Sequence, residues 1–281
     1  MPSFAFERKC GARPVAGIDE AGRGPLAGPV IAAAVVLDMA RLPRRIARRI
    51  DDSKLLPPAE REELFALLRP YAAIGVGAAS VTEIDRINIL RASLLAMRRA
   101  VEGLKITPEE AWVDGNMCPD LPCAARAIVD GDATHKPISA ASILAKTARD
   151  AEMCALHDRF PQYGFDQHKG YATAEHLEAV GRHGPCEIHR KSFYAVGVFF
   201  QGNLFGATWE TMAESLRIRS YRLYCETMKL ASMARQLADF EYRTKRLKRE
   251  YADVFASRDA APHVALVRAL LRDTRAQLRA K

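Results

Sequence analysis

The amino-acid sequence predicts an α/β fold, with a mixed five-stranded sheet flanked by helices, followed by a mostly helical C-terminal extension. Five apolar runs of strand length occur within residues 1–130, and segments of helical periodicity lie between and after them. Residues 207–261 contain neither glycine nor proline and repeat apolar residues at heptad spacing. We therefore predict an α/β domain at residues 1–200 and a basic helical extension at residues 201–281.

The first half of the predicted sheet comes from three apolar runs. Val15–Ile18 and Pro29–Leu37 are joined by a glycine-rich turn and predict a β-hairpin. A helix is predicted over residues 57–68, because proline is tolerated in the first turn of a helix. Ala72–Val81 is rich in small apolar residues and predicts the third strand.

The second half of the sheet alternates with helices. Helical periodicity over residues 87–101 precedes two short apolar runs, Glu110–Val113 and Ala125–Val129, which predict the last two strands. Small apolar residues then recur at helical spacing from 138 to about 160 and predict an amphipathic helix. Another helix is predicted at Thr173–Arg182.

Acidic residues stand at the ends of three predicted strands. Asp19 and Glu20 follow the first strand, while Asp114 and Asp132 lie at the ends of the last two. An Asp-Gly step is also typical of an ordinary turn, but strand ends are where α/β folds build their sites. Three acidic strand ends in one sheet favour a metal site, and ligands that are all oxygen suit Mg²⁺ or Mn²⁺. Neighbouring strand residues face opposite sides of a sheet, so Asp19 and Glu20 share a site only if the strand ends, twists or bulges there.

A glycine-rich turn follows the acidic pair and carries one arginine. Gly22 and Gly24 let a ligand approach the backbone closely, because glycine has no side chain. Arg23 between them is a candidate for a phosphate contact, with an ordinary surface charge as the alternative. The acids and the turn together predict a metal held next to a phosphate.

Composition narrows the class of protein. The chain has 281 residues, 49% of them hydrophobic, and six cysteines without a Cys-x-x-Cys pair. We therefore expect reduced thiols, neither a disulfide framework nor a zinc site. No apolar run reaches membrane-spanning length and the first residues lack the apolar middle of a secretory signal, so we expect a cytoplasmic protein with no membrane partner. The net charge of +8 is concentrated in residues 201–281, where 16 Lys+Arg face 9 Asp+Glu, as in many segments that bind nucleic acid.

Eight short motifs occur in one order along the first ~195 residues. They are Gly17-Ile18-Asp19-Glu20-Ala21-Gly22-Arg23-Gly24-Pro25, Asp52-Ser53-Lys54, Val113-Asp114-Gly115-Asn116, Gly131-Asp132, Ile138-Ser139-Ala140-Ala141-Ser142-Ile143-Leu144-Ala145-Lys146, Tyr163-Gly164-Phe165, His168-Lys169-Gly170-Tyr171 and His189-Arg190-Lys191-Ser192-Phe193. In this order they resemble ribonuclease HII. An ordered set of this length is far more specific than any single short motif.

The resemblance implies a ribonuclease-H-like fold and an endonuclease that cleaves the RNA strand of RNA–DNA hybrids and incises duplex DNA at single embedded ribonucleotides. It places the family's four acidic residues on Asp19, Glu20, Asp114 and Asp132. Two Mg²⁺ or Mn²⁺ ions held by such acids activate a water and stabilise the leaving 3′ oxygen, which leaves a 5′-phosphate and a 3′-hydroxyl.

The resemblance also implies how the substrate is chosen. It places the family's arginine-containing glycine turn on Gly22, Arg23 and Gly24, and its ribose-sensing tyrosine on Tyr171. The 2′-hydroxyl distinguishes RNA from DNA at one nucleotide, so we expect these groups to bind it. Lys54 is a further candidate for a phosphate contact, with surface charge as the alternative.

The extension is not explained by the resemblance. Eleven of the fourteen residues at its two heptad positions over 209–254 are apolar, which predicts one continuous helix about 70 Å long. This helix could dimerise the protein, fold back onto the catalytic domain, or serve as a basic arm for nucleic acid. The basic residues of such an arm are Arg243, Lys245, Arg246, Lys248 and Arg249. A last helix is predicted from Pro262 to about Leu278.

Two other functions stay open at this stage. One is another two-metal nuclease of the same fold, such as a junction resolvase, against which the ribose-sensing groups argue. The other is a hybrid-binding protein in which the tail is the main functional part, against which the complete set of four acids argues.

Overall fold

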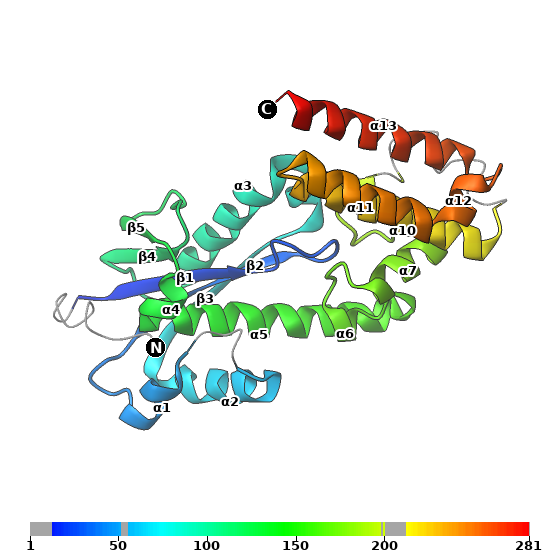
Figure 1. The fold of residues 1–281 in the computed structure, drawn as a ribbon. Helices are drawn as coiled ribbons and strands as arrows, with labels where there is room; N and C mark the ends of the chain where they lie inside the picture. Colours follow the sequence, from blue (N-terminus) through cyan, green and yellow to red (C-terminus); the bar gives the residue numbers. More distant parts are fainter. Residues whose placement is uncertain (1–12, 52–55, 198, 200–211, 281) are drawn as a thin grey trace. The chain divides into compact units, whose positions relative to one another are not determined.

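The computed structural model describes residues 13–51, 56–197, 199 and 212–280, and they form a mixed sheet with helices and a helical C-terminal region (Figure 1). The chain divides into two compact units, Met1–Asp158 and Arg159–Lys281. The predicted boundary at residue 200 lies outside the described residues and stays a prediction.

The sheet is mixed and has five strands, as the sequence predicted, and the strand order is β3-β2-β1-β4-β5. They are β1 (Val15–Ala21), β2 (Val30–Leu37), β3 (Ala72–Ala79), β4 (Glu110–Asp114) and β5 (Ala124–Ile128). The β1–β2 hairpin and the β2–β3 pair are antiparallel, whereas β1–β4 and β4–β5 are parallel. Because β1 and β4 run in the same direction, their carboxyl ends meet at one edge of the sheet.

Helices cover both faces of this sheet. The helices of the first unit are α1 (Arg44–Arg49), α2 (Pro58–Leu68), α3 (Val81–Glu102), α4 (Gly131–Thr134) and α5 (Lys136–Arg159), with a 3₁₀ turn η2 (Arg69–Tyr71). The helices α3 and α5 flank the strands on opposite sides (Figure 1). On the α5 side, Val35, Leu64 and Ile143 belong to one buried cluster that joins β2, α2 and α5.

The approach of α5 to β1 depends on Gly17. A Cβ added at Gly17 would lie 2.1 Å from the backbone carbon of Pro137, at the start of α5. No side chain fits at that distance, so the glycine lets helix and strand backbones pack directly. As a result, the residues of α5 lie close to the end of β1.

The second unit is helical. Its elements are η3 (Pro161–Tyr163), α6 (Phe165–His168), α7 (Ala174–His183), α8 (Tyr194–Gly197), α10 (Glu214–Met233), α11 (Leu237–Glu250), α12 (Ala252–Ala256) and α13 (Ala261–Arg279). The predicted helices at 173–182 and 262–278 are confirmed. No helix within the described ranges is both long and apolar enough to cross a membrane.

The prediction of one continuous helix over 209–254 is wrong. Helix α10 ends at Met233, Ala234 and Gln236 have extended backbone, and α11 begins at Leu237. The two helices run antiparallel, since Glu226 of α10 accepts the hydroxyl of Tyr251 at 2.7 Å and the earlier Arg219 reaches the later Asp253 at 2.7 Å. Residues 209–211 of the predicted helix lie outside the described residues.

The heptad residues pack against one another inside this helical hairpin. Leu223, Phe240 and Leu247 are buried in one cluster, and α13 contributes Val267 and Leu271 to it. The apolar stripe therefore covers itself within a single chain. A shared stripe of this kind has the same sequence pattern whether the facing helix comes from the same chain or from another.

Candidate active site

Asp19 lies inside a strand, near its end. β1 continues through Asp19 and Glu20 to Ala21, which is three residues beyond the predicted end. The side chain of Asp19 is buried, and its Oδ1 accepts the backbone N–H of Glu20 at 2.7 Å. The hydroxyl of Ser142, on α5, donates a second hydrogen bond to this carboxylate.

The carboxylates at the ends of β1 and β4 act on one another. Burial raises the pKa of Asp19 well above its usual value, and the charges of Glu20 and Asp114 raise it further. Burial also raises the pKa of Glu20, although Arg23, at 3.3 Å, opposes that shift. Buried like charges of this kind are costly unless a cation lies between them.

Asp114 connects the sheet to the fourth acid. It ends β4, and its Oδ1 accepts the backbone N–H of Gly131 at 2.8 Å and that of Asp132 at 3.4 Å. Asp130 precedes these residues with φ 53°, a left-handed conformation that aspartate tolerates. Asp114 thereby holds the start of α4, which carries the buried Asp132.

The donor set fits a hard divalent cation, because it consists of carboxylate oxygens without sulfur or imidazole. No three His, Cys, Asp or Glu side chains in the described ranges form a closed metal cage. Glu20 turns toward Arg23, and Asp114 toward the backbone of α4. Repulsion opposes the approach of these carboxylates to one another, so a cation would have to draw them together.

The glycine turn is supported by a buried arginine that the sequence reasoning missed. Gly22 has φ +100°, and a Cβ added there would lie 2.1 Å from Nε of Arg149. Arg149 of α5 is fully buried and donates to the carbonyls of Pro29 at 3.1 Å and Ala27 at 3.2 Å. Its guanidinium therefore joins the two sides of the segment that leads from β1 into β2.

The sequence contains a signal for Ser142 and Arg149. Both share the helical stripe of Ile138 and Ala145, at positions i, i+4, i+7 and i+11, where the other residues are apolar. A serine and an arginine on the core-facing stripe of a helix must find polar partners. Here these partners are Asp19 and the turn after β1.

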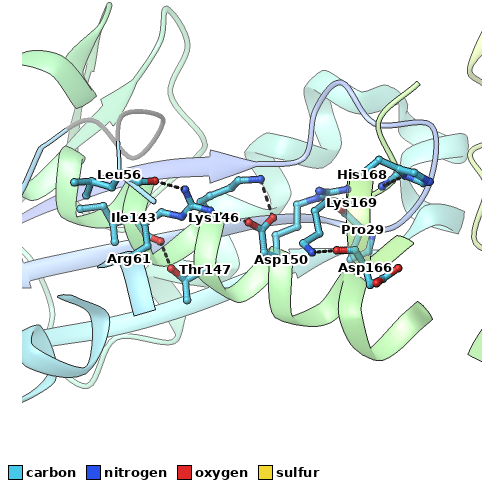
Figure 2. Close-up of polar contacts among 12 residues, drawn as sticks. Pro29, Leu56, Arg61, Ile143, Lys146, Thr147, Asp150, Asp166, His168 and Lys169 are labelled. Carbon is cyan, nitrogen blue, oxygen red and sulfur yellow. Dashed lines mark hydrogen bonds and ion pairs between the residues drawn. The ribbon is translucent and has the colours of Figure 1, made fainter. Parts of the chain in front are cut away.

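A second polar network fixes α5 against α2. Asp150 accepts from Lys146 at 2.7 Å and from Arg61 of α2 at 3.1 Å, and Arg61 also donates to the carbonyl of Leu56 (Figure 2). Only 9% of the Arg61 side chain is exposed, so this ion pair is stronger than one at the surface. It stabilises the helix that carries Ser142 and Arg149.

We expect Gly22→Ala to destabilise the protein more than the same change at Gly184. Both glycines have positive φ, but within the described residues an added Cβ at Gly184 meets no heavy atom within 4 Å, whereas one at Gly22 strikes Arg149. Strain alone costs about 1–2 kcal/mol, and overpacking adds about 1–3 kcal/mol at Gly22. Calorimetric melting of the two variants measures the difference; equal losses would contradict the Arg149 contact.

The other predicted site residues are Tyr171, Lys54, Arg23 and Gly24. Tyr171 belongs to the second unit, follows α6 and is 43% exposed. Lys54 falls outside the described residues, as does the rest of its motif. Gly24 lies in the turn after β1 beside Arg23, whose side chain is 52% exposed.

Comparison with known proteins identifies one family. The family model described as Ribonuclease HII matches residues 16–196. A ribonuclease HII from Parvibaculum lavamentivorans is 54% identical over 199 residues, which is 70% of this chain and 72% of that protein. A ribonuclease HII from Burkholderia ambifaria is 56% identical over 183 residues, 65% of this chain and 82% of that protein.

Solved structures agree with the fold. The ribonuclease H2 of Pyrococcus horikoshii aligns with a TM-score of 0.55 and 30% identity, over 65% of this chain and 95% of that one. The ribonuclease HII of Archaeoglobus fulgidus, solved in a complex with PCNA, aligns with a TM-score of 0.54 and 28% identity, over 64% and 95% of the two chains. The family model ends at residue 196, before the helices α10–α13.

Proposed function

The chain belongs to the ribonuclease HII family, and from that premise we propose that the four acids at the ends of β1 and β4 and in α4 are its metal ligands. They are Asp19, Glu20, Asp114 and Asp132. The protein is a metal-dependent endoribonuclease that cleaves the RNA strand of RNA–DNA hybrids and incises duplex DNA at embedded ribonucleotides. The observation that carries the proposal is the buried, mutually repelling set of carboxylates around Asp19.

Each acid has a stated task in this proposal. Two bound divalent ions supply an activated water and stabilisation of the leaving 3′ oxygen. Asp19 is oriented by Ser142 and lies close enough to Asp114 to feel its charge, so it would be the central ligand of the metal site. Asp114 orients the backbone that carries Asp132, and Glu20, which pairs with Arg23 in this structure, would be a further ligand of the metal. The products are a 5′-phosphate and a 3′-hydroxyl.

Substrate choice is assigned to different groups. The backbone of Gly22-Arg23-Gly24 binds the 2′-hydroxyl through its amides. At Gly22 the missing side chain makes room for Arg149, and at Gly24 it allows close approach of the substrate. Tyr171 binds the same hydroxyl or stacks on the neighbouring deoxyribose, which tests for a junction between RNA and DNA. Arg23 and Lys54 contact phosphates.

The test is cleavage of duplex DNA that contains one ribonucleotide, with an all-DNA duplex of the same sequence as control. We expect chelation of divalent ions to stop cleavage and added Mg²⁺ or Mn²⁺ to restore it, with a 5′-phosphate at the cut. Cleavage of the all-DNA control at a comparable rate would instead favour a nuclease without ribose sensing. Titration of each ion separately decides which metal supports the higher rate.

We further propose that the extension contacts the nucleic-acid backbone. Four arginines, Arg268, Arg272, Arg275 and Arg279, recur at i, i+4, i+7 and i+11 and so share one face of α13. Three of them line an open groove. The apolar stripe of the extension is covered within the chain, so we expect a monomer of 31.1 kDa by light scattering, and a concentration-dependent dimer would contradict this.

The arginine face predicts a salt-dependent effect. The double variant Arg272→Gln/Arg279→Gln is expected to weaken binding of duplexes of any sequence and to lower the slope of log K against log salt by about 2, since each lost phosphate contact contributes about 0.9. The turnover rate at saturating substrate should not change. The variant Arg235→Gln/Arg258→Gln removes the same charge from exposed positions of the same unit, outside that face. Equal slopes for both variants would exclude a specific role for α13.

A further inference from the structure

Three histidines near Tyr171, two of them buried and one half-buried, pack together within the second unit. His176 of α7 and His189 are 0% and 1% exposed. His168, the last residue of α6, stacks on His176 with ring centroids 4.4 Å apart and an interplanar angle of 16°. None of these rings belongs to the set of acids assigned to the metal, so their burial requires another explanation.

The hydrogen bonds between these rings run in one direction. His176 Nδ1 lies 2.8 Å from the carbonyl oxygen of Tyr171, which only accepts, so Nδ1 carries the proton. In a neutral ring His176 Nε2 is then an acceptor, and His189 Nε2, at 3.1 Å, must donate to it. His189 Nδ1 in turn accepts the backbone N–H of Cys186 at 3.0 Å. The network thus assigns both tautomers without ambiguity.

The surroundings keep the imidazole rings of His176 and His189 uncharged. Burial, together with the charges of neighbouring imidazoles, lowers the pKa of His176 to about 4 and that of His189 to about 3. Burial raises the pKa of Cys186 to about 11, so its thiol, 3.1 Å from His189 Nδ1, stays protonated. His168 and Tyr163 are the other titratable groups packed on these rings, the ring of Tyr163 lying 4.9 Å from that of His189.

We propose that His176 and His189 are positioning residues that hold the backbone of Tyr171 in place for the ribose–deoxyribose junction of the substrate. This rests on the proposed role of Tyr171. Its carbonyl accepts from His176 Nδ1 and from the Thr173 N–H, each at 2.8 Å, and its own N–H donates to the His168 carbonyl at 2.9 Å. The exposed phenol ring therefore extends from a backbone fixed on both sides. A shift of about 1 Å in a group that positions substrate can cost about 100-fold in rate.

Side-chain ¹⁵N NMR of the full-length wild-type protein at neutral pH tests the assigned histidine tautomers without any substitution. We expect His176 to be protonated at Nδ1 and His189 at Nε2. The reverse assignment, or fast exchange between tautomers at either ring, would overturn the proposal. This measurement does not depend on cleavage, on the metal or on the stability of a variant.

Variants then test the link to the substrate. His176→Leu removes the donor to Tyr171, and we expect kcat/KM on a duplex with one embedded ribonucleotide to fall at least tenfold more than kcat/KM on an RNA–DNA hybrid. His176→Asn places an amide N–H near the position of Nδ1 and should restore most of this ratio. His263→Leu removes another buried histidine of the same unit, in α13, and should leave the ratio unchanged. No restoration by His176→Asn, or an equal change in His263→Leu, would count against the proposal.

The variant Tyr171→Ala, alone and combined with His176→Leu, separates the positioning role of His176 from the proposed role of Tyr171. If Tyr171→Ala leaves the ratio of the two substrates at the wild-type value, the proposed role of Tyr171 fails. If Tyr171→Ala changes the ratio but a folded His176→Leu does not, the positioning role fails. We expect His176→Leu to have no further effect on the ratio once Tyr171 is absent, whereas an additive effect would contradict action through Tyr171.

Discussion

Asp19→Asn is expected to lower metal-dependent cleavage at least about 1000-fold while raising the melting temperature of the metal-free protein. The loss corresponds to about 4 kcal/mol of transition-state stabilisation, at about 1.4 kcal/mol per factor of ten. Asparagine keeps the shape of the side chain and an oxygen that can accept from the Glu20 N–H. It removes the negative charge that the proposed metal site requires.

The expected rise in stability follows from the direction of the pKa shift. The folded protein raises the pKa of Asp19 above its ordinary value, so between the two values the folded state binds more protons than the unfolded state. Stability therefore falls as pH increases through that window, because ionising the buried carboxylate is less favourable in the folded state than in the unfolded state. Replacing it with a neutral amide removes this cost. Added Mg²⁺ should also raise the wild-type melting temperature, and should do so less in the variant.

Asp130→Asn is the matched control for this experiment. Asp130 is exposed, lies two residues before Asp132, and has a left-handed backbone that asparagine adopts readily. We expect near-normal cleavage and an unchanged response to Mg²⁺. If Asp19→Asn retains cleavage within tenfold of the wild type, the metal-ligand assignment is wrong. A lower melting temperature in Asp19→Asn would show that its hydrogen bonds outweigh the repulsion.

Arg149→Leu is expected to cause the largest loss of stability, about 3–5 kcal/mol. The substitution removes this donor from the carbonyls of Ala27 and Pro29 in a buried site. Each buried carbonyl that loses its hydrogen bond lowers the free energy of unfolding by about 1–3 kcal/mol. It also removes the side chain that packs on Gly22. Since the turn between β1 and β2 then loses its internal support, we expect cleavage of both substrate classes to fall together.

Arg149→Lys separates charge from geometry. Lysine keeps the positive charge but has no planar fork, so it can serve only one of the two carbonyls well. We expect a melting temperature between those of the wild type and Arg149→Leu, measured by calorimetry. If Arg149→Leu melts like the wild type, the buried arginine does not support the turn, and the explanation given for Gly22 fails with it.

The sheet was predictable because each strand is encoded by a local apolar run. Asp132 was expected at the end of the fifth strand but lies in α4, after β5 has ended at Ile128. The position of Asp114 was predictable, since parallel strands bring their carboxyl ends to one edge. The end of β1 was not, because Asp19 and Glu20 stay in the strand through pairing with β2, a contact that no local pattern encodes. The parallel pairing of β1 with β4 then brings them close to Asp114.

The helical extension marks the limit of sequence reasoning most clearly. Residues 234–236 contain neither glycine nor proline, so nothing local predicts the break between α10 and α11. Heptad spacing predicts only that a helix has an apolar stripe that packs against the stripe of another helix. It does not say whether the facing stripe comes from the same chain. The role of the buried Arg149 was not predicted for a related reason, because its partners, Ala27 and Pro29, are distant in sequence.

The parallel pairing of β1 with β4 also sets an order for folding during synthesis. The β1–β2 hairpin pairs residues as close as Ala21 and Ile31, whereas β1 and β4 join Val15 to Glu110, nearly a hundred residues later. Local pairings form before distant ones, because less chain entropy is lost in closing short loops. The hairpin that carries Asp19 can therefore form early on the ribosome, but it gains Asp114 and Asp132 only after most of the first unit has emerged. The metal site is thus among the last features of the first unit to assemble, so a chain that ends before Asp114 carries half of the acids and no complete catalytic centre.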